Sequence, residues 1–102
     1  MINDVALTAL VKRIAGDLLG EDHVHELPRP SMGGEDFACY LSKVPGAMFR
    51  LGCARTAAGG PHLHAPDFDV DEAALPIGAR ILAHAVVEWC DPESPVGTSF
   101  VI

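Results

Sequence analysis

The stretch GGPHLHAPDFDVDEAALPIGARIL, residues 59–82, joins a Gly/Pro-rich loop to the most apolar helical segment of the chain. Its second half carries apolar residues at helical spacing, which predicts a helix that begins near Asp71. The residues expected on the buried side of this helix are Leu75, Ile81, Leu82, Ala85, Val86 and Trp89. Pro76 lies near the helix start, where a missing backbone N–H costs little. The loop ahead of the helix holds two histidines, His62 and His64, between prolines.

Two further helices and two strands are predicted upstream of that stretch. Asn3 is the expected cap of a first helix and Gly20 its expected end. Between them the apolar residues Leu7, Leu10, Val11, Ile14 and Leu18 recur at three- and four-residue spacing. Residues 35–43 predict a short helix, whereas the alternating run at 23–27 and the apolar run at 47–53 predict strands. This order favours an α/β fold in which helices pack on a small sheet. Because two strands alone are marginally stable, the sheet is expected to be incomplete.

Composition excludes several classes of partner. The 102 residues carry a net charge of −7, which disfavours binding to nucleic acid or to an anionic membrane surface. Three cysteines without metal-ligand spacing, and no secretory signal at the start of the chain, favour a reducing, cytoplasmic location. The last apolar segment carries Arg80, His84 and Glu88, which argues against a transmembrane helix.

Two motifs invite a functional reading, and each has a plain structural alternative. His62 and His64 suit either a metal site or an ordinary solvent-exposed loop, and zinc needs three or four ligands. The remaining histidines lie elsewhere in the chain, at His23, His25 and His84. In SMGGEDF, residues 31–37, two glycines ahead of an acidic helix start suit either an anion site or a tight turn.

Two longer segments together resemble a known family. SMGGEDFACYLSKVPGAMFRLG, residues 31–52, and HLHAPDFDVDEAALPIGARILAHAV, residues 62–86, resemble the C-terminal end of the metal-dependent amidohydrolase and carboxypeptidase family. That family includes hippurate hydrolase, N-acyl-amino-acid amidohydrolases and indole-3-acetyl-amino-acid hydrolases. The resemblance covers roughly residues 3–90.

The resemblance implies a fold and a set of site residues. It implies that residues 1–90 are the C-terminal portion of an α/β/α zinc-peptidase-like catalytic domain, with the lid domain absent, and that residues 91–102 are a tail. The histidine before Ala-Pro in the last loop, His64, is then a metal ligand. Gly33 and Gly34 fall where the family's loop lines the substrate-binding cleft. The family's other ligands and its general base have no counterpart here, so no catalytic residue is expected in this chain.

The resemblance also implies an activity. The parent enzyme is expected to hold two divalent ions, zinc or else manganese or cobalt, and to hydrolyse the amide bond of N-acyl amino acids or related small peptides. The chain itself is then an inactive fragment whose partner is the remainder of the enzyme. The alternative is a stand-alone, non-catalytic binding or assembly module that keeps the family fold. Apolar faces without a covering sheet further predict self-association.

Overall fold

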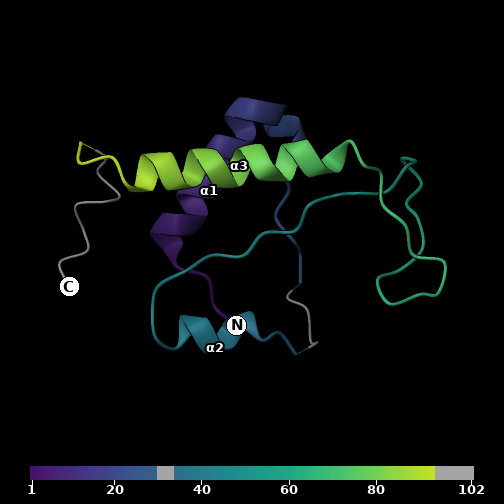
Figure 1. Ribbon diagram of the computed structural model, residues 1–102, viewed down its shortest axis with the longest axis horizontal. Coiled ribbons are helices and arrows are strands. Elements are labelled where there is room, and N and C mark those ends of the chain that lie inside the picture. The colour runs from purple at the N-terminus through teal and green to yellow at the C-terminus, as the bar shows by residue number, and fades with distance from the viewer. Residues whose placement is uncertain (30–33, 94–102) are drawn as a thin grey trace.

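The computed structural model describes residues 1–29 and 34–93. Its elements, in chain order, are α1 (Val5–Leu19), the 3-10 helix η1 (Glu21–His23), α2 (Phe37–Leu41) and α3 (Ala74–Trp89). Figure 1 shows α3 crossing α1, with α2 below this pair and a long loop at the right that leads into α3. None of the helices in the described ranges has the length and apolar character needed to span a bilayer.

The first helix is capped by Asp4, one residue later than predicted. The Asp4 Oδ1 atom accepts a hydrogen bond from the backbone N–H of Leu7 at 2.9 Å, which satisfies one of the unpaired donors of the first turn. Asn3 pairs with Met48 instead: its Nδ2 donates to the Met48 carbonyl at 2.8 Å, and its Oδ1 accepts from the Met48 N–H at 3.1 Å. The predicted end at Gly20 is confirmed, with a φ of 89° that suits glycine.

Both predicted strands are wrong for the described residues, and the structure there is helical rather than α/β. Residues 23–27 begin in η1 and continue without regular structure. Residues 47–53 have no regular structure and pair with no other strand; the Asn3 side chain takes the place of a neighbour at Met48. A strand needs a second strand to pair with its backbone groups. The described part of the chain supplies none, so the apolar pattern at 47–53 does not become a sheet.

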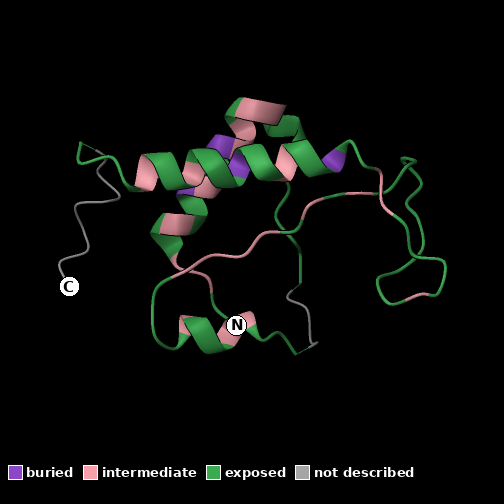
Figure 2. Cartoon of the chain, in the orientation of Figure 1, coloured by how far each residue is buried: buried purple, intermediate pink, exposed green. Residues whose placement is uncertain are grey.

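The core is small and lies between α1 and α3. Leu10, Ile14 and Ile81 form its buried centre. The half-buried side chains packed around them are Leu7, Val11, Ala15, Leu18, Leu19, Phe49, Ile77, Ala85 and Trp89. Figure 2 shows buried residues where the two helices cross and a further one at the start of α3, whereas much of the remaining chain is exposed.

Three residues of α3 that were expected inside are exposed. Leu75, Leu82 and Val86 are 61%, 57% and 62% accessible to solvent. They are offset around the helix from Ile81, which faces α1. A single neighbouring helix covers one stripe of α3, so the second apolar stripe has no cover within the described residues.

The last helix begins at Ala74 rather than near Asp71. Asp71 caps the turn that leads into it: its Oδ1 accepts from the Ala73 N–H and its carbonyl from the Ala74 N–H, both at 3.0 Å. Pro76 falls in the first turn, as predicted, where its missing N–H has no helical partner to lose. The middle helix, α2, is shorter than the predicted span 35–43.

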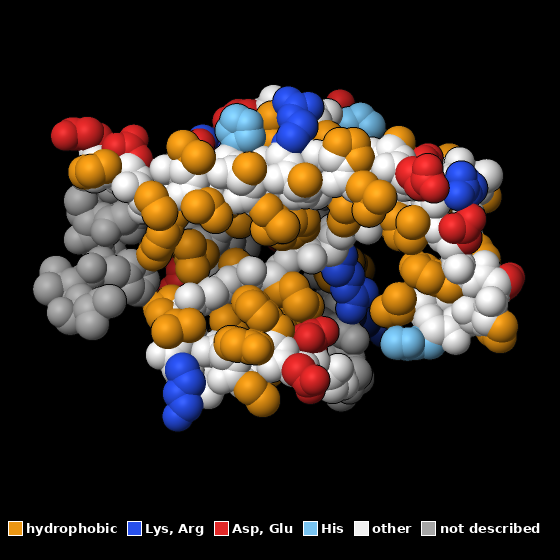
Figure 3. Space-filling view, in the orientation of Figure 1, with side chains coloured by type: hydrophobic (Ala, Val, Ile, Leu, Met, Phe, Trp, Pro, Cys, Tyr) orange, Lys and Arg blue, Asp and Glu red, His pale blue; other side chains and the backbone are white. Residues whose placement is uncertain are grey.

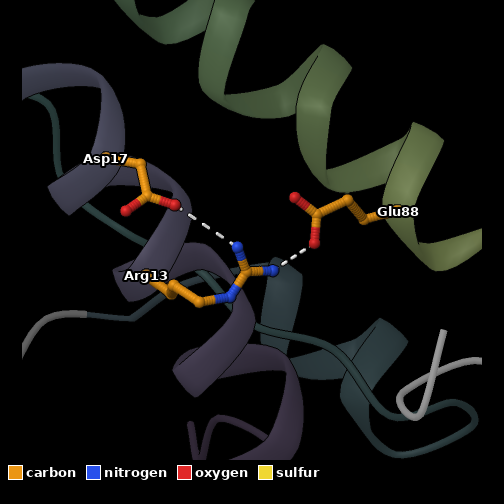
Figure 4. Close-up of polar contacts among 3 residues, drawn as sticks. All are labelled: Arg13, Asp17 and Glu88. Atoms are coloured by element: carbon orange, nitrogen blue, oxygen red, sulfur yellow. Dashed lines mark hydrogen bonds and ion pairs between the residues drawn. The ribbon is translucent and has the colours of Figure 1, made fainter.

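A surface ion-pair cluster joins the two long helices. Arg13 on α1 contacts Glu88 on α3 and, at 3.4 Å, Asp17 on its own helix (Figure 4). The hydrogen bond to Glu88 is the main cause that raises the pKa of Arg13. Because Arg13 and Asp17 are exposed and Glu88 is only half-buried, the cluster contributes little to stability.

Candidate functional site

The histidine-bearing loop, residues 54–70, is closed at its base by two contacts. The Asp71 N–H donates to the Cys53 carbonyl at 2.7 Å, and Arg55 Nη2 lies 2.9 Å from Asp69 Oδ2. These two contacts hold the two ends of the surface loop together. The second end of the loop lies immediately ahead of α3.

The Asp69 carboxyl at the end of this loop is negatively charged at neutral pH. The backbone N–H of Val70, which donates to Asp69 Oδ1 at 2.9 Å, and then the Arg55 side chain lower the pKa of the Asp69 carboxyl below its ordinary value. Both contacts favour the carboxylate form. The Asp69 carboxyl opposite Arg55 is therefore ionised across the whole neutral range.

The two histidines lie in one tight turn within this loop. The Ala65 N–H donates to the His62 carbonyl at 2.9 Å, and His64 occupies the third position of the turn with a φ of 73°. No other non-glycine residue in the described ranges has a positive φ. A left-handed conformation costs a side-chain-bearing residue about 1–2 kcal/mol, and such strain concentrates at functional sites. His62 and His64 are both exposed.

The structure does not gather a metal centre from the described residues. His84 lies on α3, while His23 ends η1 and His25 follows it, well ahead of the loop in the sequence. Residues 1–29 and 34–93 contain no group of three or more His, Cys, Asp or Glu side chains able to hold a metal ion. A zinc site needs three or four such donors, so the donor set described here does not fit one by itself.

Of the two glycines predicted to line the cleft, only Gly34 lies within the described residues. Gly33 lies outside the described residues. Gly34 is exposed, and a Cβ placed on it would meet no atom within 4 Å. Within the described chain Gly34 therefore borders open space rather than a wall.

Sequence reasoning missed one contact that closes the loop and one that ties the start of the chain to residue 48. The Arg55–Asp69 pair closes the loop, and the only hint in the sequence is one opposite charge at each end of it. The Asn3–Met48 pairing carried no signal, because the two residues are 45 positions apart. Helix caps are read from local sequence, whereas these contacts depend on how the chain returns on itself.

The chain is similar to a known peptidase family over most of its length. The model of the peptidase family M20/M25/M40 matches residues 1–88. No solved structure matches the chain significantly.

Three curated relatives illustrate the similarity. A probable hydrolase of Synechocystis is 41% identical over 85% of this chain and 22% of its own length. A protein of Rhodococcus jostii that bears the name of a glutamate–cysteine ligase is 44% identical over 80% of this chain and 10% of its own. An IAA-amino acid hydrolase of Arabidopsis thaliana is 40% identical over 83% of this chain and 18% of its own. The chain thus spans at most 22% of the length of these three relatives.

Proposed function

The chain belongs to the peptidase family M20/M25/M40, and we propose that it is the C-terminal catalytic-domain portion of a metal-dependent amidohydrolase. The observation that carries the proposal is the family match over residues 1–88. The name of the Arabidopsis relative, an IAA-amino acid hydrolase, supports the amide bond of an N-acyl amino acid, or of a related small peptide, as the bond cleaved. A location in the cytoplasm is part of the same proposal.

His64 is the residue that contributes to the metal site. Its strained φ of 73° and its exposed place in a closed loop support a side chain kept for its imidazole rather than for packing. The remaining ligands, and the general base, belong to parts of the enzyme outside the described residues. Zinc is the expected ion, since imidazole suits it; manganese and cobalt are the ions to compare. His62 is a neighbour of the site and not a ligand.

The chain depends on the rest of the enzyme for its activity and for a complete fold. The backbone between Phe49 and Gly52 makes no hydrogen bond to another described part of the chain, which supports an extended segment that pairs with a strand supplied elsewhere. Such a strand would complete the α/β/α layer that the family resemblance implies. Gly33 and Gly34 then line the substrate cleft once that layer closes over them.

The first experiment asks how long the natural polypeptide is and whether this chain alone is active. Mass spectrometry of the protein isolated from its source cells is expected to give a polypeptide several times longer than 102 residues. The purified 102-residue chain is expected to hydrolyse no N-acyl amino acid with zinc, manganese or cobalt. Metal-dependent turnover by the 102-residue chain, or a natural polypeptide of this length, would contradict the fragment assignment. Either result would favour a self-contained module.

The second experiment tests His64 in the longer polypeptide. His64→Ala is expected to abolish most hydrolysis of N-acyl amino acids and to lower the bound metal measured by atomic emission. His62→Ala, in the same turn and equally exposed, is the matched control and is expected to keep both. Equal losses in the two variants, or full metal content without His64, would remove His64 from the site.

A further inference from the structure

The turns of the histidine-bearing loop bond to one another and not to the helices. The Gly59 N–H donates to the Thr56 carbonyl at 3.0 Å. The Ala65 N–H closes the turn that carries His64, and the Phe68 N–H in turn donates to the Ala65 carbonyl at 3.0 Å. Within the described ranges, each of these hydrogen bonds has both partners inside the loop. The position of the loop relative to α3 therefore depends on how its two ends are held.

The two ends of the loop meet in antiparallel register. The Asp71 N–H donates to the Cys53 carbonyl at 2.7 Å. Two residues further into the loop on each side, Arg55 Nη2 lies 2.9 Å from Asp69 Oδ2. In an antiparallel pair, side chains that lie directly opposite each other interact. We call these four residues the neck. Figure 3 shows basic and acidic side chains gathered where the loop approaches α3, and a histidine at the far end of the loop.

The inner pair of the neck, Cys53 and Asp71, is held by α3 on both sides. Asp71 accepts hydrogen bonds from the N–H groups of Ala73 and Ala74, each at 3.0 Å, in the turn that leads into the helix. On the other side, a Cβ at Gly78 would lie 2.9 Å from Leu51 Cδ2. The helix and the segment ahead of the loop therefore approach each other closely. With the inner pair held in this way, the outer pair sets the direction in which residues 56–68 leave the neck.

The outer pair has a fixed geometry although it is exposed. Asp69 uses its two oxygens separately: Oδ1 accepts the Val70 N–H at 2.9 Å, and Oδ2 faces Arg55. The backbone thus orients the carboxylate before Arg55 meets it. We propose that Arg55 and Asp69 are positioning residues that hold the turn carrying His64 in place relative to α3. This inference rests on the proposed function, in which His64 serves the site.

The first test measures amide hydrogen exchange of residues 56–68 in the longer polypeptide. Asp69→Asn keeps an oxygen for the Val70 N–H and removes the charge that faces Arg55. It is expected to speed exchange in the loop about two- to fivefold, the range that an exposed ion pair gives. Asp67→Asn is the matched control, because Asp67 is exposed in the same loop and has no ion pair among the described residues. It is expected to change exchange by less than about 1.5-fold.

Salt and a conservative variant separate the charge pair from a merely structural role. Because the pair is exposed, about 1 M salt is expected to speed loop exchange in the wild type and to leave Asp69→Asn unchanged. Hydrolysis of an N-acyl amino acid is expected to follow the loop: Asp69→Asn lowers kcat about two- to fivefold and leaves KM within about twofold, since it displaces a group that acts on the reacting bond. Arg55→Gln is expected to behave like Asp69→Asn, whereas Arg55→Lys retains the charge and most of the activity.

His64→Ala, measured beside these variants, separates this inference from the proposed function. If His64→Ala is inactive while Asp69→Asn matches Asp67→Asn in exchange and in kcat, the positioning role is overturned and the proposed function stands. The same holds if Arg55→Lys is no better than Arg55→Gln. If His64→Ala keeps its activity, the proposed role of His64 is lost, and the exchange measurements alone decide whether the neck holds the turn.

Discussion

Replacing Ile81 by alanine tests the assignment of the core to the α1–α3 crossing. Ile81 is 2% exposed and is one of three residues at the buried centre. The change removes three carbon atoms, worth about 0.8 kcal/mol each on transfer from water. The cavity left behind adds to this loss, so the expected destabilisation is about 3 kcal/mol. For a chain of this size, that loss lowers the melting temperature by roughly 12–24 °C.

The assay is thermal and urea unfolding followed by far-UV circular dichroism. Val87→Ala is the control: it removes apolar atoms from the same helix at a side chain that is 70% exposed, and it is expected to change stability by less than about 0.5 kcal/mol. The assignment of the core is refuted if the free energy of unfolding of Ile81→Ala stays within about 1 kcal/mol of the wild-type value. It is also refuted if Val87→Ala lowers that free energy as much as Ile81→Ala does.

Three further predictions concern the start of the chain and the histidine-bearing loop. Asn3→Ala leaves the backbone N–H and C=O of Met48 without their side-chain partner, so urea unfolding is expected to show a loss of about 1–2 kcal/mol; an unchanged midpoint would contradict the pairing. His64→Gly relieves a non-glycine residue at a φ of 73°, so the chain is expected to gain about 0.5–1 kcal/mol although it loses the imidazole, and a loss of stability in thermal unfolding would show that the side chain packs. The Val70 N–H and Arg55 lower the pKa of Asp69 in the folded chain. The ionised carboxyl therefore contributes to stability above the unfolded pKa of about 3.9. This contribution disappears as the pH falls through the lower folded pKa. Asp69→Asn is therefore expected to be less stable than the wild type at neutral pH and equal to it at strongly acidic pH, which unfolding curves across pH 2–7 would check; a constant difference at all pH values would exclude the carboxylate as its cause.

Only part of the candidate site could be predicted from local sequence. The prolines and glycines around His62 and His64 predicted an irregular loop ahead of the last helix, and the structure confirms that loop. The role of His64 came from the family resemblance and stays a prediction, because no described side chain joins it in a cluster of ligands. The positive φ of His64 was not predicted from the sequence, and it accompanies the turn that the Ala65 N–H closes on the His62 carbonyl.

What the sequence determined by itself is the helices and the family. Three- and four-residue apolar spacing predicted α1 and α3 because a helix repeats every 3.6 residues whatever surrounds it. The motifs around the two glycines and the last loop indicated the family that matches residues 1–88.

Only the tertiary structure decided which apolar residues lie inside and whether the apolar run at 47–53 becomes a strand. Ile81 is buried while Leu82, its neighbour, is exposed, because α1 covers one side of α3. Residues 47–53 have the composition of a strand but form none, because the described residues offer no second strand. Burial and strand pairing both need a partner surface, and a residue's own sequence neighbourhood does not contain one.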